Sequence, residues 1–336
     1  MTYPRYQLVP PDEPGFYHCH SRCVRRCFLC GKDSQTGKDY EHRRQWLEDL
    51  IEKHSRCFAV SIYSYSIMHN HFHIALYIDP SAPENWPARE VAQRWLKVFP
   101  GALKNARTEE EKNEVIDTIA ADDDRIAELR GRLGNLGWFM RSISQPLARR
   151  ANIEDECTGR FWEGRFKVQA LLDQRAVLSC MTYIDLNPVR AKLCDQLADC
   201  AHTSIQKRIR AHLSSVAIDP SSAEQPLRPI FSGLKKVDHT LLPISISRYI
   251  ELTQWTGEQL WPGKSGRLKS SHGPAQESLL SEKQKLWLRQ VKATESAYAR
   301  AIGSVESLIR KAASMNQAWL KGIGFARAMP SMTTPS

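Results

Sequence analysis

The sequence lacks any apolar run that approaches the roughly 20 residues of a membrane-spanning helix. Its first residues, MTYPR, are not followed by the apolar core of a signal peptide. No internal repeat is evident either. These absences argue against a membrane protein and favour a cytoplasmic one. A chain of 336 residues has ample length for one large domain or two smaller ones.

Acidic residues are also in short supply. The chain has 37 Asp and Glu against 47 Lys and Arg, which gives a formal net charge of +10. An excess of this kind suits a polyanionic partner, of which nucleic acid is the usual one, although many basic proteins have no such partner. Contents of 42% hydrophobic and 25% charged residues are ordinary for a globular protein.

The chain also lacks an even number of cysteines, since it has nine. In a reducing compartment this number argues against a disulfide framework. Four of them, Cys19, Cys23, Cys27 and Cys30, follow a C-x3-C-x3-C-x2-C pattern, in which only the last pair has common zinc-site spacing. We therefore expect reduced, partly buried thiols there rather than a structural zinc site.

What the sequence does contain is a histidine pair in an apolar stretch, MHNHFHIALYI, at 68–78. Side chains alternate between the two faces of a strand, so His71 and His73 point the same way, with Phe72 packed behind them. Two imidazoles on one face can hold a metal ion if a third group arrives from elsewhere. The alternative is a pair of hydrogen-bonded histidines on a half-buried strand.

The succession of elements predicts an α+β fold. Strand patterns at 16–22 and 57–67 flank a helix at 40–54, and the histidine strand follows. The order strand, helix, strand, strand suggests helices over the faces of an antiparallel-rich sheet. Helices are predicted also at 88–98 and 136–150.

A charged helical insertion is expected between these two helices, at about 101–135. Its acidic runs, 109–111 and 122–124, indicate a solvated face rather than a metal site.

The segment 159–170 mixes aromatic and basic residues and is predicted to be a strand. Arg160, Arg165 and Lys167 could bind phosphates while Trp162 stacks on unpaired bases. The alternative is an ordinary edge strand protected from aggregation by its charges.

The next helix is predicted to begin at the capping residue Asp173 and to end at Pro188. Tyr183 and Asn187 are four residues apart in it and therefore share one face. Arg190 continues the basic character beyond that end and is a further candidate for DNA binding.

The predicted domain organisation has three parts. Residues 1–212 form the main domain, and 213–235, rich in Ser and Pro, form a linker. Residues 236–336 form a basic, mainly helical C-terminal region. It could read DNA as a helix-turn-helix, although a helical pair packed on the main domain is the commoner arrangement.

Tyr183 and Asn187 can supply what the histidine pair lacks. A tyrosine hydroxyl can attack phosphorus and leave a covalent phosphotyrosine. A divalent ion held by His71, His73 and an amide oxygen would polarise the scissile phosphate. The alternative for Tyr183 is a helix tyrosine that only packs on the sheet.

Three stretches carry a resemblance to a known family: MHNHFH at 68–73, GRFWEGRF at 159–166 and YIDLNPVRA at 183–191. They resemble the His-hydrophobic-His motif, the preceding segment and the tyrosine helix of single-tyrosine HUH transposases, most closely the REP-associated and insertion-sequence-type branch. The resemblance covers roughly residues 15–210. His69 stands where a proline is frequent in the family, and the insertion and the region after about 213 lie outside the minimal family domain.

The resemblance implies a ferredoxin-like sheet and a DNA transposase that cleaves and rejoins single-stranded DNA through a 5′-phosphotyrosine. Tyr183 matches the nucleophile, and His71, His73 and Asn187 match the ligands of Mg²⁺ or Mn²⁺. The implied substrate is single-stranded DNA, with hairpin or palindromic ends, and the protein could be a monomer or a homodimer. A transposase-derived DNA-binding regulator without cleavage, or a nickase of the replication-initiator or relaxase kind, are the alternatives.

Overall fold

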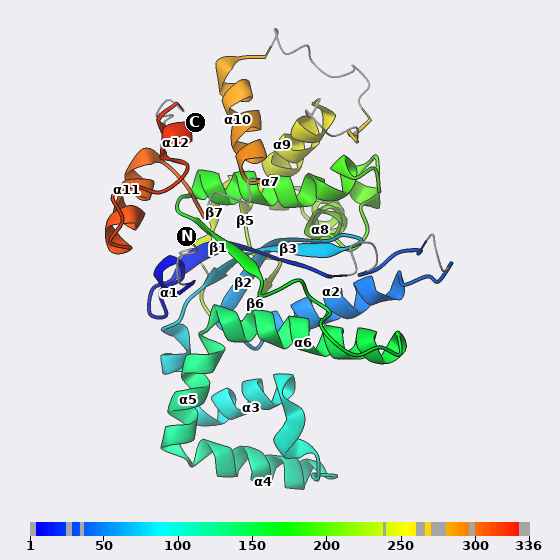
Figure 1. The fold of residues 1–336 in the computed structure, drawn as a ribbon, viewed down its shortest axis with the longest axis vertical. Helices are drawn as coiled ribbons and strands as arrows, with labels where there is room; N and C mark the ends of the chain where they lie inside the picture. The colour runs from blue at the N-terminus through cyan, green and yellow to red at the C-terminus, as the bar shows by residue number, and fades with distance from the viewer. Residues whose placement is uncertain are drawn as a thin grey trace.

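A six-stranded sheet forms the centre of the protein (Figure 1). The computed structural model describes residues 5–24, 29–33, 37–237, 240–259, 266–269, 280–295 and 300–328. The strands lie in the order β6-β2-β3-β1-β4-β8. Their bounds are β1 Gly15–Arg22, β2 Val60–Ile67, β3 His71–Ile78, β4 Lys167–Leu171, β6 Phe231–Ser232 and β8 Ala301–Ile302. Neighbouring strands pair antiparallel, except that β8 joins β4 in parallel.

Strands β1 to β4 have the ferredoxin-like arrangement. Helix α2 (His42–Ser55) connects β1 to β2, and helix α6 (Leu136–Glu154) leads from β3 towards β4. The resulting βαββαβ unit has the strand order β2-β3-β1-β4, and α2 and α6 lie on the same face of the sheet (Figure 1). The predicted α+β fold with an antiparallel-rich sheet is thereby confirmed.

The opposite face of the sheet is covered by helices from the second half of the chain. These are α7 Gln174–Arg190, α8 Ser204–Ile218, α9 Ile246–Glu258 and α10 Glu282–Ala293. In Figure 1, α7 lies against the sheet, and α9 and α10 lie beyond it. The smaller elements are α1 Arg5–Leu8, η3 Leu197–Asp199, η4 Pro220–Glu224, β5 Pro226–Leu227, β7 Leu242–Ser245, α11 Val305–Ser314 and α12 Ile323–Arg327. None of the helices in the described ranges is long and apolar enough to cross a membrane.

Alternation along β3 divides its side chains between two apolar layers. Phe72 belongs to the core on the side of α2 and α6, and Ala75 and Tyr77 belong to the core that contains α7. Because the alternation has a period of two, His71 and His73 face α7. The sheet therefore presents the histidine pair to the helix that carries Tyr183.

The predicted helical insertion folds into a separate group of helices next to α6 (Figure 1). Within the predicted bounds of about 101–135 lie most of η2 Pro100–Leu103, α4 Glu109–Ala120 and α5 Asp123–Leu133, and they are preceded by η1 Ala82–Asn85 and by α3 Ala88–Val98. Each acidic run lies at a helix start: Glu111 closes a capping box with Thr108, and Asp122 caps α5. Acidic groups stabilise the positive end of a helix dipole, which agrees with a structural role for both runs.

Two local predictions around the tyrosine helix are wrong. The strand predicted at 159–170 is confined to Lys167–Leu171, since Trp162 makes only an isolated bridge to Cys23. Helix α7 does not end at Pro188 but continues to Arg190. Pro188 lies in the last turn of α7 and lacks the N–H that would bond to the preceding turn.

The predicted linker and C-terminal region are parts of the main fold. Within 213–235 the structure has the end of α8 and strand β6, which pairs with β2. Beyond it, β8 adds to the sheet beside β4, and α10 packs against α7. The described part of the C-terminal region thus packs against β4 and α7.

The cysteines differ from the expectation in one respect, a disulfide between Cys194 and Cys200. The predicted thiols Cys19 and Cys30 are free and buried, Cys23 is buried as well, and burial raises the pKa of Cys30 to about 12. Cys27, the remaining member of the tested zinc pattern, lies outside the described residues.

Candidate active site

The histidine pair belongs to a larger group of imidazoles on the α7 side of the sheet. Antiparallel pairing of β1 with β3 places His20 opposite His73 and Arg22 opposite His71, and His18 lies two residues before His20. The ring of His73 lies 4.9 Å from that of His71, 5.1 Å from that of His18 and 5.4 Å from that of His20. Two adjacent strands therefore each contribute a His-x-His to one face.

His18 fixes the tautomer of His73 through buried hydrogen bonds. Nδ1 of His18 lies 2.7 Å from Oε1 of Gln169, and with this end of the amide facing the ring, Nδ1 carries the proton. Nε2 of His18 is then an acceptor, and Nδ1–H of His73 donates to it across 2.8 Å. The other nitrogen of His73, Nε2, is then unprotonated and carries a lone pair. It is buried and has no hydrogen-bond partner among the described residues.

Burial keeps His18, His20 and His73 neutral. Burial lowers the pKa of His18 to about 4, although Gln169 opposes this. Burial, followed by the neighbouring histidines and cations, lowers the pKa of His20 to about 3 and that of His73 well below its ordinary range. Neutral imidazoles retain the lone pairs that metal coordination requires.

Tyr183 lies on α7 directly over this group. Asp173 caps the start of α7, as predicted, by accepting a hydrogen bond from the backbone N–H of Ala176. The ring of Tyr183 lies 5.7 Å from that of His73 at an angle of 88°, and 6.2 Å from that of His18. Burial, and then the charge of Glu295, raises the pKa of the Tyr183 hydroxyl, which is therefore protonated at neutral pH.

Asn187 lies one helical turn after Tyr183, on the same side of α7. Its amide nitrogen is buried and has no hydrogen-bond partner in the described part of the chain. The two ends of an amide are assigned from their hydrogen bonds, and no bond from the amide nitrogen to a described residue fixes this assignment. A half-turn of the amide presents an oxygen there.

These residues fit a divalent metal ion. His73 offers an unpartnered Nε2, and Nδ1 of His71 lies 2.5 Å from Oδ1 of Asn70, which leaves Nε2 of His71 as its basic nitrogen. The unsatisfied amide of Asn187 can supply the third ligand. Among the described residues, no three His, Cys, Asp or Glu side chains are arranged to hold an ion. The candidate ligand set is therefore two imidazoles and an amide.

The residues predicted to bind DNA fall into different places. Lys167 pairs with His20 across β1 and β4, which puts its charge at the edge of the histidine group. Arg160 and Arg165 are exposed. The indole of Trp162 instead packs against Phe72, on the far side of the sheet, and donates a hydrogen bond to the carbonyl of Ser144.

Arg190 is not a surface cation. Its guanidinium is buried and donates hydrogen bonds to the carbonyl oxygens of Thr256, Gln259 and Gly266. A buried arginine that holds three carbonyls ties the end of α7 to the end of α9 and to the segment after it. The structure corrects the prediction that this residue contacts DNA.

Sequence reasoning missed His18, His20, Arg22 and Gln169. A signal for the first two was present, because HCH at 18–20 in a predicted strand repeats the His-x-His pattern of HFH at 71–73. What the pattern alone does not specify is that the two strands are neighbours and place both pairs on one face.

No protein-family model matches the chain, and no curated protein sequence matches it significantly. Among solved structures, the chain is similar to one described as a REP-associated tyrosine transposase bound to a REP hairpin. The similarity covers 59% of this chain and 81% of that chain, with 14% sequence identity and a TM-score of 0.35. So distant a likeness carries no functional detail, which must come from the residues of this chain.

Proposed function

We propose that the protein is a metal-dependent DNA transposase that cleaves and rejoins single-stranded DNA through a 5′-phosphotyrosine intermediate. The observation that carries this proposal is the ring of Tyr183, which lies 5.7 Å from the ring of His73. A helix tyrosine that only packed on a sheet would face apolar side chains. This one faces neutral imidazoles, one of which has an unpartnered lone pair.

The proposed reaction needs no redox partner. The oxygen of Tyr183 bonds to a backbone phosphorus while the bond from that phosphorus to the 3′ oxygen breaks. The departing 3′ oxygen takes up a proton, and the tyrosine proton goes to solvent. Attack by a 3′-hydroxyl on the phosphotyrosine reverses these steps and joins two strands.

His71, His73 and Asn187 would hold Mg²⁺ or Mn²⁺. When bound, such an ion supplies positive charge that polarises the scissile phosphate and stabilises a departing oxygen. The protein's own contribution is to keep the imidazoles neutral and His73 in the ligating tautomer. Lys167 and Arg22, at the edge of the same face, supply charge for the flanking phosphates.

The nucleophile is tested with a single-stranded hairpin oligonucleotide, Mn²⁺ and a denaturing gel that resolves covalent protein–DNA adducts. The wild-type protein should form an adduct, and Tyr183→Phe should form none while it binds DNA with nearly unchanged affinity. The matched control is Tyr6→Phe, which removes an exposed hydroxyl and should leave the adduct intact.

An adduct in Tyr183→Phe would show that the nucleophile is another residue. If the wild-type protein binds DNA but forms no adduct with Mn²⁺, the protein is a DNA-binding regulator instead. For the metal, EDTA and the variant His71→Ala should each abolish cleavage, and full cleavage in EDTA would refute a metal-dependent reaction.

A further inference from the structure

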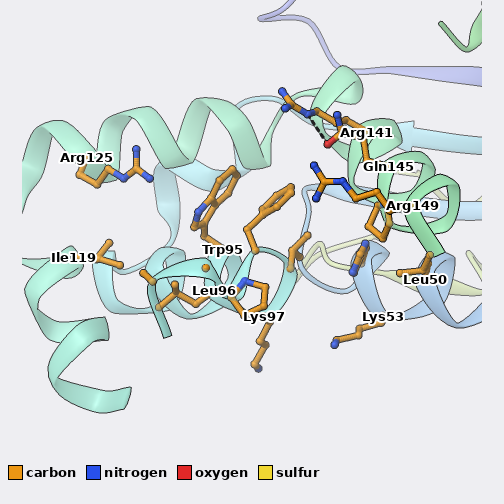
Figure 2. A pocket seen from close by; sticks show the side chains of 17 residues that line it. Leu50, Lys53, Trp95, Leu96, Lys97, Ile119, Arg125, Arg141, Gln145 and Arg149 are labelled. Atoms are coloured by element: carbon orange, nitrogen blue, oxygen red, sulfur yellow. Dashed lines mark hydrogen bonds between the residues drawn. The ribbon is translucent and has the colours of Figure 1, made fainter. Parts of the chain in front are cut away.

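A second site lies on the opposite side of the sheet from the histidine group. It is a pocket of about 650 Å³ between α2, α6 and the insertion helices. Its walls come from the ends of α2 and α3, from η2, and from residues of α4, α5 and α6. In Figure 2, Arg141, Gln145 and Arg149 follow one helix along one side, and Arg125 lies across from them.

The charged side chains that line this pocket are basic. Its lining contains Lys53, Lys97, Arg125, Arg141 and Arg149, and none of the described residues that line it is acidic. Arg125 forms an ion pair with Glu128, and Arg141 donates a hydrogen bond to Gln145 across 3.1 Å. In the described part of the chain, no ion pair involves the other three cations.

So many cations around one pocket lower the stability of the folded protein when no ligand is bound. Like charges around one pocket repel one another and destabilise the folded state. The insertion has acidic residues, but its acidic runs lie at the starts of α4 and α5 and take no part in the lining. An anion in the pocket would relieve this repulsion.

The pocket also offers an aromatic surface. Phe99 lines it, is half-buried, and packs against Trp95 with ring centroids 4.3 Å apart. Trp138 backs both rings, and the guanidinium of Arg141 lies 4.8 Å from the centre of the Trp138 ring. The arrangement combines a supported aromatic face with several cations. Single-stranded nucleic acids are bound in this way, with phosphates on cations and bases on rings.

We propose that this pocket binds a segment of single-stranded DNA, with phosphates on Lys53, Lys97 and Arg149 and a base on Phe99. Its place on the other side of the sheet makes it distinct from the Tyr183 site. The inference rests on the proposed function only for the choice of DNA as the nucleic acid.

The test measures binding of a fluorescent oligothymidine to the full-length protein by anisotropy, in EDTA, over a range of salt concentrations. The double variant Lys53→Gln with Arg149→Gln should make the slope of log affinity against log salt shallower by about 1.4, or about 0.7 for each phosphate that is no longer neutralised. The control, Lys104→Gln with Arg107→Gln, removes two exposed cations of the same insertion that do not line the pocket. Its slope should stay near that of the wild-type protein.

A second pair of variants tests stacking. Phe99→Leu should weaken binding about fivefold or more without a change in salt slope, and Phe99→Tyr, which keeps the ring, should retain affinity. Equal slopes in the two double variants, or equal affinities in the two Phe99 variants, would overturn the proposal. So would displacement of the oligothymidine by polyglutamate of equal charge, which would indicate an acidic protein as the partner. Because no cleavage is needed, these outcomes do not depend on whether Tyr183 forms an adduct.

Discussion

The tautomer of His73 depends on a glutamine that would not touch DNA or metal. If Gln169 is replaced by leucine, Nδ1–H of His18 loses its acceptor in the pair of hydrogen bonds, 2.7 and 2.8 Å long, that links Gln169, His18 and His73. Leaving that buried donor unsatisfied costs about 1–3 kcal/mol. His18 can avoid the cost by moving its proton to Nε2, which then donates to His73 and forces a proton onto Nε2 of His73. That nitrogen can no longer bind a metal ion.

This energy of an unsatisfied donor determines how far the response to Mn²⁺ should shift in Gln169→Leu. The ligating tautomer of His73 becomes less favourable by about 1–3 kcal/mol, so the Mn²⁺ concentration that gives half-maximal adduct formation should rise about fivefold to a hundredfold. The rate at saturating Mn²⁺ should approach that of the wild-type protein, because bound metal restores the tautomer. Nitrogen-15 spectra of the imidazoles should show the His18 proton on Nδ1 in the wild-type protein and on Nε2 in Gln169→Leu.

The same measurements can refute the reasoning. If the His18 proton stays on Nδ1 and the Mn²⁺ response is unchanged, the hydrogen-bond chain does not control His73. A loss of rate that saturating Mn²⁺ does not restore, together with a lower melting temperature, would indicate that Gln169 only supports the fold.

Two further predictions concern stability. Burial would raise the pKa of Glu48, but hydrogen bonds and charges, first that of His202, lower it from 4.5 to about 2. Since the folded-state pKa is depressed, the stabilisation is complete above pH 4.5 and is lost as the pH falls towards 2. In urea unfolding, the stability difference between the wild-type protein and Glu48→Gln should shrink over that range, and a constant difference would contradict the assignment. At Gly233 a Cβ would overlap the carbonyl oxygen of Phe58, so Gly233→Ala should lower the free energy of unfolding by about 1–3 kcal/mol. Gly131→Ala, in an open helix position, should instead raise it, and equal effects would argue against the overlap.

Elements with strong periodicity could be predicted from the sequence. The helix predicted at 88–98 has those bounds in the structure, and alternation places His71 and His73 on one face with Phe72 on the other. Such features depend on side chains close together in the chain, which is where sequence patterns are informative.

Features that depend on distant partners were not predictable in this way. The segment 159–166 has strand-like composition but pairs with its neighbour only through the isolated bridge of Trp162 to Cys23, whereas β8, two residues long, has no visible pattern and is held by β4. Arg190 looked like a surface cation because nothing nearby in sequence shows the three carbonyls that surround it. The second histidine pair required knowledge that β1 and β3 are neighbours.

The position of Tyr183 over the histidines depends in part on a contact from beyond residues 15–210, the range of the family resemblance. Asp185, two residues further along α7, is fully buried and accepts hydrogen bonds from Ser64 of β2 at 3.0 Å, Ser204 of α8 at 2.6 Å and Tyr249 of α9 at 2.5 Å. One carboxylate thus joins the tyrosine helix to the sheet and to two helices that follow it. A bonded, buried carboxylate holds its helix closely, because removal of any partner leaves a buried acceptor unsatisfied. The alignment of nucleophile and histidines is therefore a property of the whole chain through α9, and not of the βαββαβ unit and its tyrosine helix alone.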